Sequence, residues 1–259
     1  MFLLRKWYLD LITSDGTVLI LYAARLRWRT LRLGYASVLH AAPAEPRWEE
    51  ATIRRVEEPR LQGNVLRWQS DMLQVRGLWR RDTPPIRRTL ARGRDGVIQW
   101  TCHMPRARAS VTCRDAALDG VGYVESLRLT ILPWKLPFRT LRWGRHASDR
   151  HSLVWIDWGG AGRDHRRWVW FDGHEEYDTA LTESGLSGLA GGGELHLEGS
   201  RDVRDRRVLA TLTDVVPALA RLVGPLAGMH EHKQVDRSSI VRAGQPLDHG
   251  WTLHEVVTW

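Results

Sequence analysis

Short runs in which apolar and polar residues alternate cover most of the chain, and turn-forming residues separate them. Alternation with a period of two is typical of β-strands that bury one face. The runs predict about a dozen short strands, at the spacing found in β barrels and sandwiches. We therefore expect an all-β fold with antiparallel sheets. The expected strands are residues 6–12, 17–28, 31–39, 64–69, 72–79, 97–103, 107–114, 123–131, 153–158, 167–171, 194–198, 208–212 and 251–257.

Asp-Gly pairs stand at four places where a turn is expected. An Asp-Gly pair between two apolar runs is typical of a type I′ hairpin, because both central residues of that turn need positive φ. Pro105 is expected to separate residues 97–103 from residues 107–114, so that these two runs form a pair of strands. The four pairs are Asp15-Gly16, Asp95-Gly96, Asp119-Gly120 and Asp172-Gly173.

One segment, residues 214–226, has helical spacing of its apolar residues instead. Asp214 could cap its beginning, and Pro217 falls within the first turn, where proline is tolerated. Gly224 and Pro225 would end it early. We expect one short helix in an otherwise β protein.

Trp is the unusual feature of the composition, with 14 residues against 3 Phe and 5 Tyr. Its side chain combines a large apolar face with an N–H group that needs an acceptor. Most of the Trp residues are expected in the core or at strand edges, and the others could line an apolar ligand cavity. Hydrophobic residues at 43% and charged residues at 26% are the balance of a globular protein rather than a disordered one.

The net charge of +8 is carried mainly by Arg and is spread along the chain. A basic surface can attract nucleic acid, anionic lipid or an acidic partner. The densest groups mix with Asp or alternate with apolar residues, and neither zinc-finger spacing nor an RNA-binding aromatic signature is found. We expect no nucleic-acid partner, and weak association with a membrane surface stays an alternative.

The cysteine content and the ends of the chain bear on the compartment. The N-terminal sequence is not a secretory signal, and the longest apolar run, residues 18–24, is too short to span a bilayer. Two cysteines, Cys102 and Cys113, are too few for a disulfide scaffold. A soluble cytoplasmic protein with two buried free thiols is expected.

Several common catalytic signatures are absent from the sequence. It contains no G-x-S-x-G elbow, no phosphate-binding glycine loop, no G-x-G-x-x-G after a strand and no H-E-x-x-H. His230 and His232 could offer metal ligands from one face of a strand, since alternate residues point the same way. No third ligand is in view, so neither a metal nor a cofactor is expected.

Residues 99–145 carry motifs that occur in the same order in one known family. With residues 6–16 and 250–255, which look like that family's opening hairpin and closing strand, they resemble the lipocalin-like carotenoid 1,2-hydratases (hydroxyneurosporene synthases). The resemblance implies two lipocalin-like β modules, residues 1–118 and 119–259, with a cavity for a hydrophobic small molecule. The motifs are Trp100, Pro105-Arg106-Ala107, Gly120-Val121-Gly122-Tyr123-Val124-Glu125 and Arg142-Trp143-Gly144-Arg145.

The resemblance also implies a chemistry, the cofactor-free addition of water to an alkene. In that family a carboxylic acid protonates a carbon–carbon double bond, aromatic faces stabilise the carbocation, and water adds. The acid position falls on Glu125, where the family has Asp, and the aromatic positions fall on Tyr123 and Trp100. An acid that protonates carbon must keep its proton near neutral pH, which requires apolar, desolvated surroundings.

Further residues are candidates for ligand contact. Trp143 and Arg145 belong to the family-like motif, and Trp155 and Asp157 alternate on a predicted strand. Because residues i and i+2 of a strand share a face, Asp157 is a second candidate acid beside Trp155.

Three functional hypotheses follow from the sequence. The first is an enzyme that hydrates, cyclises or isomerises an isoprenoid or polyene. The second is a non-catalytic lipocalin-like carrier of a lipid or pigment, and the third is an Arg-rich surface module. In the second and third, Glu125 would be structural, in an ion pair with Arg128, Arg142 or Arg145.

Overall fold

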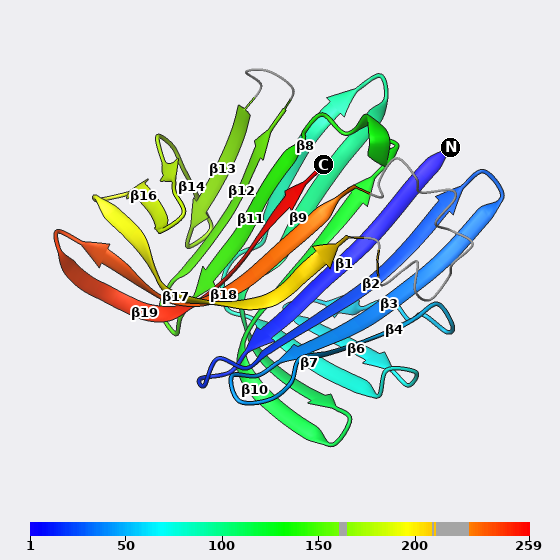
Figure 1. Ribbon diagram of the computed structural model, residues 1–259, viewed down its shortest axis with the longest axis horizontal. Coiled ribbons are helices and arrows are strands. Elements are labelled where there is room, and N and C mark those ends of the chain that lie inside the picture. Colours follow the sequence, from blue (N-terminus) through cyan, green and yellow to red (C-terminus); the bar gives the residue numbers. More distant parts are fainter. Residues whose placement is uncertain (161–164, 209, 211–227) are drawn as a thin grey trace. The chain divides into compact units, whose positions relative to one another are not determined.

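The structure is a computed structural model that describes residues 1–160, 165–208, 210 and 228–259. The described chain forms two compact units, Met1–Pro137 on the one hand and Phe138–Val208 with Gly228–Trp259 on the other. Each unit is built on one antiparallel sheet, as the alternation predicts (Figure 1).

The first unit contains a 10-stranded sheet in the order β4-β3-β2-β1-β10-β9-β7-β6-β5, with β8 paired to β9 off this path. The first strand lies next to the last, so the two ends of this unit's chain meet in the middle of its sheet. A short 3-10 helix, Pro133–Lys135, follows. The strands are β1 (Phe2–Ile12), β2 (Val18–Trp28), β3 (Leu31–Ala41), β4 (Trp48–Thr52), β5 (Arg60–Gln62), β6 (Val65–Ser70), β7 (Val75–Arg81), β8 (Ile86–Gly93), β9 (Gly96–Cys113) and β10 (Ala116–Leu129).

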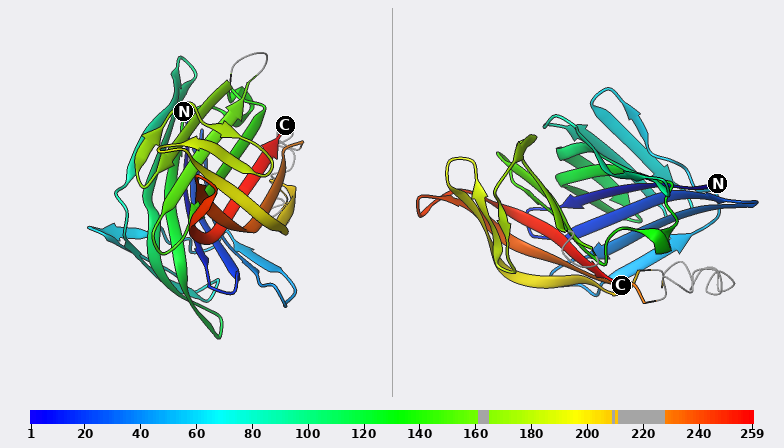
Figure 2. Two further views of the ribbon diagram at one scale, coloured as in Figure 1. Left: turned by 90° about the vertical axis from the view of Figure 1, so that its left-hand side faces the viewer. Right: turned by 90° about the horizontal axis from the view of Figure 1, so that it is seen from above.

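The second unit contains a 9-stranded sheet in the order β14-β13-β12-β11-β19-β18-β17-β16-β15. Three long, bent strands, β17 to β19 (yellow to red in Figure 2), lie next to one another in this sheet. The strands are β11 (Thr140–Ala147), β12 (Ser152–Gly159), β13 (His165–Phe171), β14 (His174–Glu176), β15 (Ala180–Leu181), β16 (Gly185–Leu189), β17 (Gly193–Arg207), β18 (His230–Arg242) and β19 (Gln245–Thr258).

The expected division between residues 118 and 119 falls inside β10. This strand pairs with β1 over nine residue pairs from Leu4↔Leu129 to Ile12↔Val121, and it also pairs with β9. Cutting the chain at 118 would remove the strand that joins the two halves of the first sheet. The structure therefore divides the chain after Pro137.

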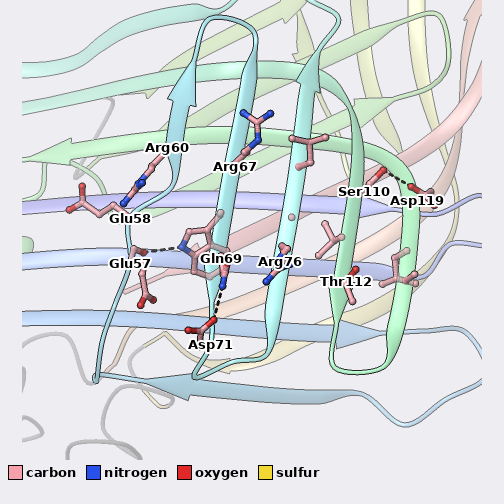
Figure 3. Close-up of a pocket in the computed structure, with 16 residues that line it drawn as sticks. Glu57, Glu58, Arg60, Arg67, Gln69, Asp71, Arg76, Ser110, Thr112 and Asp119 are labelled. Carbon is pink, nitrogen blue, oxygen red and sulfur yellow. Dashed lines mark hydrogen bonds between the residues drawn. The ribbon is translucent and has the colours of Figure 1, made fainter.

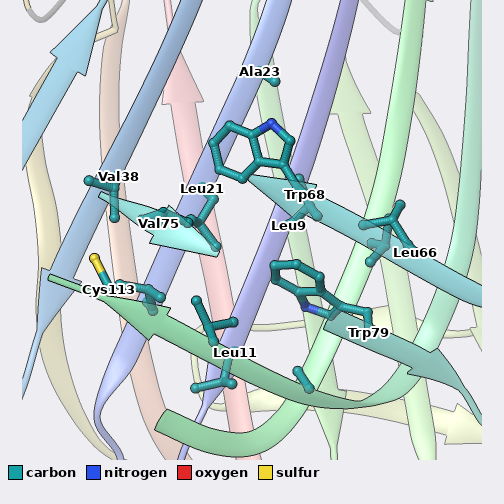
Figure 4. Packing of buried hydrophobic residues seen from close by; sticks show 14 of the residues in the cluster. Leu9, Leu11, Leu21, Ala23, Val38, Leu66, Trp68, Val75, Trp79 and Cys113 are labelled. Atoms are coloured by element: carbon teal, nitrogen blue, oxygen red, sulfur yellow. The ribbon is translucent and has the colours of Figure 1, made fainter. Parts of the chain in front are cut away.

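Alternate side chains of the first sheet fall on two different faces. On β6 and β7, Arg67, Gln69 and Arg76 line a pocket of about 700 Å³ (Figure 3). Trp68 and Trp79, from the same two strands, point the other way into the hydrophobic core (Figure 4). We call the side that carries Trp68 and Trp79 the core face, and the other side the opposite face.

The core forms because the sheet curls until its two halves face one another. Leu9 and Leu11 of β1 and Leu21 of β2 pack in the same cluster as Trp68 and Trp79. The Trp79 indole is completely buried, and its Nε1 donates a hydrogen bond to the backbone oxygen of Asp10 at 2.9 Å. This bond crosses the core and satisfies the one polar group that the indole brings into it.

The hairpin turns differ from the expectation at three of the four Asp-Gly pairs. Asp172 and Gly173 both have positive φ and join two paired strands, as a type I′ turn requires. At Asp15-Gly16 and Asp95-Gly96 only the glycine has positive φ, so those turns are not of that type. The remaining pair, at residues 119–120, is no turn at all but lies within β10.

Gly120 instead allows the backbones of two strands to approach each other closely. A Cβ atom there would lie 2.2 Å from the backbone oxygen of Ile12. The hairpin that joins β9 and β10 turns at residues 114–115, and Arg114 takes the positive φ of 53°.

Pro105 does not separate two strands, because β9 runs continuously from Gly96 to Cys113. A β-bulge accommodates it. Pro105 and Arg106 together lie opposite the single residue Tyr123, between the pairs Ala107↔Gly122 and Met104↔Val124. Proline lacks the N–H that a regular ladder uses, so a bulge is one of the few places where a strand tolerates it.

Two sequence expectations lie outside the described residues. They are the helix of residues 214–226 and most of the strand at residues 208–212. The all-β, antiparallel architecture itself is confirmed.

The close packing of Trp79 generates a stability prediction. A Cβ atom at Gly122 would lie 2.7 Å from both Trp79 Cδ1 and Ala109 Cβ. Gly122→Ala should therefore lower the free energy of unfolding by about 1–3 kcal/mol, the usual cost of overpacking a core. Urea unfolding followed by circular dichroism measures it.

Gly93→Ala is the matched control, because nothing lies within 4 Å of a Cβ atom at that position. Its free energy of unfolding should stay within about 0.5 kcal/mol of the parent protein. Equal effects of the two substitutions would contradict the packing argument.

Candidate functional site

Glu125 receives hydrogen bonds from both aromatic residues that the sequence grouped with it. Trp100 Nε1 donates to Glu125 Oε2 at 2.6 Å, and the Tyr123 hydroxyl donates to the same oxygen at 2.7 Å. Trp100 lies on β9 and the other two on β10. Both donors are buried, at 3% and 0% exposed, whereas Glu125 is only half-buried. The structure thus brings the three predicted catalytic residues together on the opposite face.

Two further tyrosines extend this cluster across the neighbouring strands. Tyr8 of β1 is the direct partner of Glu125 in the sheet register, and Tyr22 of β2 is the partner of Tyr8. The Tyr8 ring packs edge-on against Tyr22 and Tyr123, with centroid distances of 5.2 and 6.0 Å. Directly paired residues of an antiparallel sheet share a face. Glu125 is therefore flanked by aromatic side chains from three strands.

A second carboxyl group belongs to the same face. Asp10 is two residues from Tyr8, pairs with Tyr123 in the register and is completely buried. From the sequence, Asp157 is the second candidate acid and Asp10 is not a candidate. The signal for it was present, because Tyr8 and Asp10 alternate in the strand that resembles the family's opening strand.

Tyr123 and Cys102 keep their protons in this environment. Burial raises the pKa of the Tyr123 hydroxyl well above its ordinary value, and the neighbouring Cys102 and Glu125 raise it further. Burial likewise raises the pKa of the Cys102 thiol. Tyr123 therefore remains a hydrogen-bond donor to Glu125 at neutral pH, and the thiol is not a thiolate nucleophile. Both cysteines are free and buried, as expected.

In the second unit, Trp143 and Arg145 border a cluster of buried charges. Lys233 Nζ lies 5.5 Å from the centre of the Trp143 ring, forms an ion pair with Glu255 and lies 3.3 Å from Glu231 Oε1. Trp143, Glu255 and Lys233 are consecutive partners across β11, β19 and β18, so they share one face.

Arg204 and Arg145 add two more cations to this cluster. Arg204 Nη1 lies 3.3 Å from Glu231 Oε2, and Arg145 is completely buried, two residues from Trp143 on β11. Sequence reasoning missed Lys233, Glu231 and Arg204. Their alternation in a charged stretch is typical of a solvent-exposed strand face, and only the register shows that they are buried.

Trp155 and Asp157 lie on the other face of the second sheet from Trp143 and Arg145. Trp155 packs in the core cluster with Leu153 and Val169. It fills the space above Gly144, where a Cβ atom would lie 2.1 Å from its ring. Asp157 accepts from Arg167 Nε at 2.7 Å and lies 2.8 Å from His165 Nε2. The predicted ligand-binding set is thus split between two faces.

His230 and His232 each lie against an aspartate rather than against a common centre. His230 Nε2 is 3.2 Å from Asp205, and His232 Nε2 is 2.8 Å from Asp202. Within the part of the chain that the structure describes, no group of three or more His, Cys, Asp or Glu residues could hold a metal ion.

Comparison with known proteins shows which solved structures share this fold. No protein-family model and no curated protein sequence matches the chain. Solved structures do match it over nearly its whole length. An AttH-like protein of Nitrosomonas europaea superposes with a TM-score of 0.58 and 12% identity, over 98% of this chain and 92% of that one.

Two other matches are similar in extent. CghA in complex with Sch210972 gives a TM-score of 0.56 and 11% identity, over 99% of this chain and 88% of that one. Kievitone hydratase of Nectria haematococca gives 0.57 and 10%, over 98% and 88%. The chain shares their fold. The lipocalin-like fold implied by the sequence motifs is therefore confirmed.

The described residues include no helix that is both long enough and apolar enough to cross a membrane.

His146, next to Arg145, generates a prediction about pH. It is completely buried, and its Nδ1 lies 2.8 Å from the Ser238 hydroxyl. Burial lowers the pKa of this imidazole from 6.5 to about 3. Below pH 6.5 the unfolded chain binds a proton that the folded chain does not bind, so stability should fall as the pH drops from 6.5 toward 3.

His146→Gln should remove this dependence, which amounts to about 1.4 kcal/mol per pH unit for one proton. Urea unfolding from pH 8 to pH 4 tests it in both proteins. The difference in unfolding free energy between them should be constant above pH 7 and change below pH 6. Parallel curves over the whole range would show that His146 is not the titrating group.

Proposed function

We propose that the chain is an enzyme of the hydratase/lyase or isomerase type that acts on a hydrophobic, unsaturated substrate such as an isoprenoid or polyene. Glu125 is the general acid in this proposal, and it needs no cofactor. The observation that carries it is the pair of hydrogen bonds from Trp100 and Tyr123 to one oxygen of Glu125.

Those two bonds define which oxygen of the carboxyl group transfers the proton. Indole N–H can only donate, and Tyr123 keeps its hydroxyl proton, so Glu125 Oε2 accepts from both. The transferable proton is therefore carried on Oε1. Because Trp100 and Tyr123 hold Oε2 in place, they fix the direction in which Oε1 presents that proton.

The reaction balances without an external acid. The proton of Glu125 forms a C–H bond with the electron pair of the alkene, which leaves a carbocation and a carboxylate. A lone pair of water then bonds to the cation, and the resulting oxonium returns a proton to Glu125. In a cyclisation, a second alkene attacks the cation, which closes a ring and leaves a new cation, and the loss of a neighbouring proton to the Glu125 carboxylate then forms an alkene. In an isomerisation, the first cation loses a neighbouring proton to that carboxylate directly.

The aromatic residues around Glu125 support the cationic step. The faces of aromatic rings attract cations by about 0.5–2 kcal/mol per contact. Tyr8 and Tyr22 lie in the same row across the sheet as Glu125, and both are almost completely buried. Asp157 does not serve as the acid, because its carboxylate is held by Arg167 and His165. Asp10, by contrast, is a buried carboxyl on the same face as Glu125.

The names of the solved neighbours agree with this proposal without deciding it. One of the proteins that share the fold is a hydratase, kievitone hydratase. At 10% identity this likeness extends to the fold alone, so the proposal depends on the residues around Glu125.

The alternative is a non-catalytic carrier of a lipid or pigment. One observation favours it, because the bond from Trp100 to Glu125 also ties β9 to β10 and could serve the sheet alone. The 700 Å³ pocket of the first unit does not support the carrier hypothesis, since ten of its sixteen lining residues are charged or polar (Figure 3). A carrier binds the ligand without changing it, so turnover separates the two functions.

Ligand binding is the first test. Farnesol and geranylgeraniol do not absorb at the wavelengths of Trp emission, and either should shift the intrinsic fluorescence of the 14 Trp residues. Octanol, which is apolar but lacks the isoprenoid chain, is the control. If neither isoprenoid shifts the emission more than octanol, both the enzyme and the carrier hypotheses for this ligand class are wrong.

Catalysis is the second test. Turnover of an isoprenoid is detected by chromatography with mass spectrometry, as a product that has gained water or has a changed retention time. Glu125→Gln keeps the size of the side chain and removes the acid, so this turnover should fall by about 100-fold or more. Asp119→Asn is the matched control, since it makes the same change on the same strand and face at an exposed position. Its turnover should match the parent protein.

Circular dichroism and the fluorescence titration separate the outcomes for Glu125→Gln. Lost turnover with retained folding and binding supports the acid. Retained turnover excludes it, and unfolding indicates that Glu125 acts in the sheet.

A further inference from the structure

The core face of the first sheet carries a second pocket, on the other side of the same strands from Glu125. The register places Arg5, Arg128, Gln99 and Thr89 in one row across β1, β10, β9 and β8. A second row, two residues along, consists of Trp7, Ser126, Thr101 and Arg87. These two rows line a pocket of about 500 Å³, which we call the basic pocket.

Positive charge is in excess in the basic pocket. Glu58 is the one acidic residue of its lining, and it already forms an ion pair with Arg25 at 2.8 Å. Within residues 1–160, 165–208 and 228–259, no carboxylate is paired with Arg5, Arg87 or Arg128; Arg128 donates to the neutral Gln99 at 3.0 Å. Three guanidinium groups from three strands thus line the pocket, and none of them has a carboxylate partner in the described part of the chain.

Trp7 of the second row forms an aromatic pair with His103, which is not one of the lining residues of the pocket. The Trp7 ring stacks on His103 with a centroid distance of 4.8 Å and an angle of 21° between the planes. His103 Nε2 lies 2.8 Å from the Ser126 hydroxyl, which fixes the imidazole. Burial and the nearby Arg87 lower the pKa of His103 to about 4, so the imidazole is neutral at pH 7 and adds no charge beside Trp7.

We propose that the basic pocket binds an organic anion, a phosphate or carboxylate group carried on a flat aromatic or conjugated body. Guanidinium groups bind both kinds of anion through charge-assisted, often bidentate hydrogen bonds. Thr101 and Ser126 add hydroxyl groups between the cations. The flat body packs along Trp7, which is half-buried and so keeps part of its ring open to the pocket.

The size and place of the pocket agree with such a ligand. A volume of about 500 Å³ is in the range that small-molecule sites occupy, roughly 300–1,000 Å³. Side chains of successive residues leave a strand on opposite faces. Trp100 also borders the basic pocket, but its indole N–H donates to Glu125, which does not line the pocket. The inference therefore stands apart from the function proposed for Glu125.

The test uses four defined probes, namely 1-naphthyl phosphate, 1-naphthoate, 1-naphthol and inorganic phosphate, measured by isothermal titration calorimetry. We expect one or both naphthyl anions to bind, and their affinity should fall with added salt, because salt screens the cations. Naphthol should not bind. Phosphate ester and carboxylate share the predicted chemistry, and their relative affinities identify which group the site prefers.

Two double variants with the same change in charge decide whether the pocket is the site. The double variant Arg87→Gln/Arg128→Gln should lower the affinity for the preferred anion by about tenfold or more, since each substitution removes a charge-assisted contact. Arg32→Gln with Arg92→Gln removes two exposed charges outside the pocket and should leave the affinity nearly unchanged. Circular dichroism confirms that both variants fold.

Each other result overturns the inference. Equal weakening in the two double variants would show attraction by the diffuse basic surface. If naphthol bound as tightly as the two naphthyl anions, the site would be apolar. If inorganic phosphate bound as tightly as naphthyl phosphate, recognition of an aromatic body would be excluded. Binding of no probe would exclude the site. Glu125→Gln should leave anion binding intact, so failure here and failure of the proposed function are distinguishable.

Discussion

Two breaks in the alternation of β9, one on each side of Met104, decide which side chains of this strand reach the core of the first unit. A strand that alternates strictly would place Cys102 and Met104 on the same face. The bulges around Pro105 instead put Met104 in the core beside Trp68 and leave Cys102 opposite Glu125. The two shifts cancel, so Ala107 and Thr101 both belong to the core face, and Cys102 and Trp100 both belong to the face of Glu125. Without the shifts, Met104 would leave the core.

Much of the fold could be predicted because it depends on local rules. The period-two runs indicated strands at the right places, as residues 6–12 and 17–28 show in β1 and β2. The errors arose where a local rule met a distant partner. Gly120 was interpreted as a turn residue, but it is required by the backbone of Ile12 in β1. No window of sequence around residue 120 contains that information.

The residues of the candidate site likewise fall into those that the sequence predicts and those that only the sheet register reveals. Glu125, Tyr123 and Trp100 were predicted through a family resemblance, and two of them sit on one strand two residues apart. Tyr8 and Asp10 come from a strand more than a hundred residues away, and only the register of β1 against β10 places them beside this group. In the second unit, the sequence around Lys233 and Glu231 is typical of a solvent-exposed strand face. Only the pairing of their strand with β19 and β17 shows that both residues are buried.

Trp100 differs from the core tryptophans in the acceptor that its indole uses. A buried indole N–H must find an acceptor, and the nearest backbone carbonyl normally suffices. Trp68 donates to the backbone oxygen of Glu57 and Trp79 to that of Asp10. Trp100 donates to a carboxylate side chain, which could carry a proton and is itself half-buried. A bond to a backbone carbonyl serves packing alone, because that oxygen cannot change its protonation state. The bond of Trp100 to Glu125 instead couples a buried residue of the sheet to a carboxyl group, which can transfer protons, and for this reason the proposed chemistry is assigned to Glu125 rather than to a site at the other tryptophans.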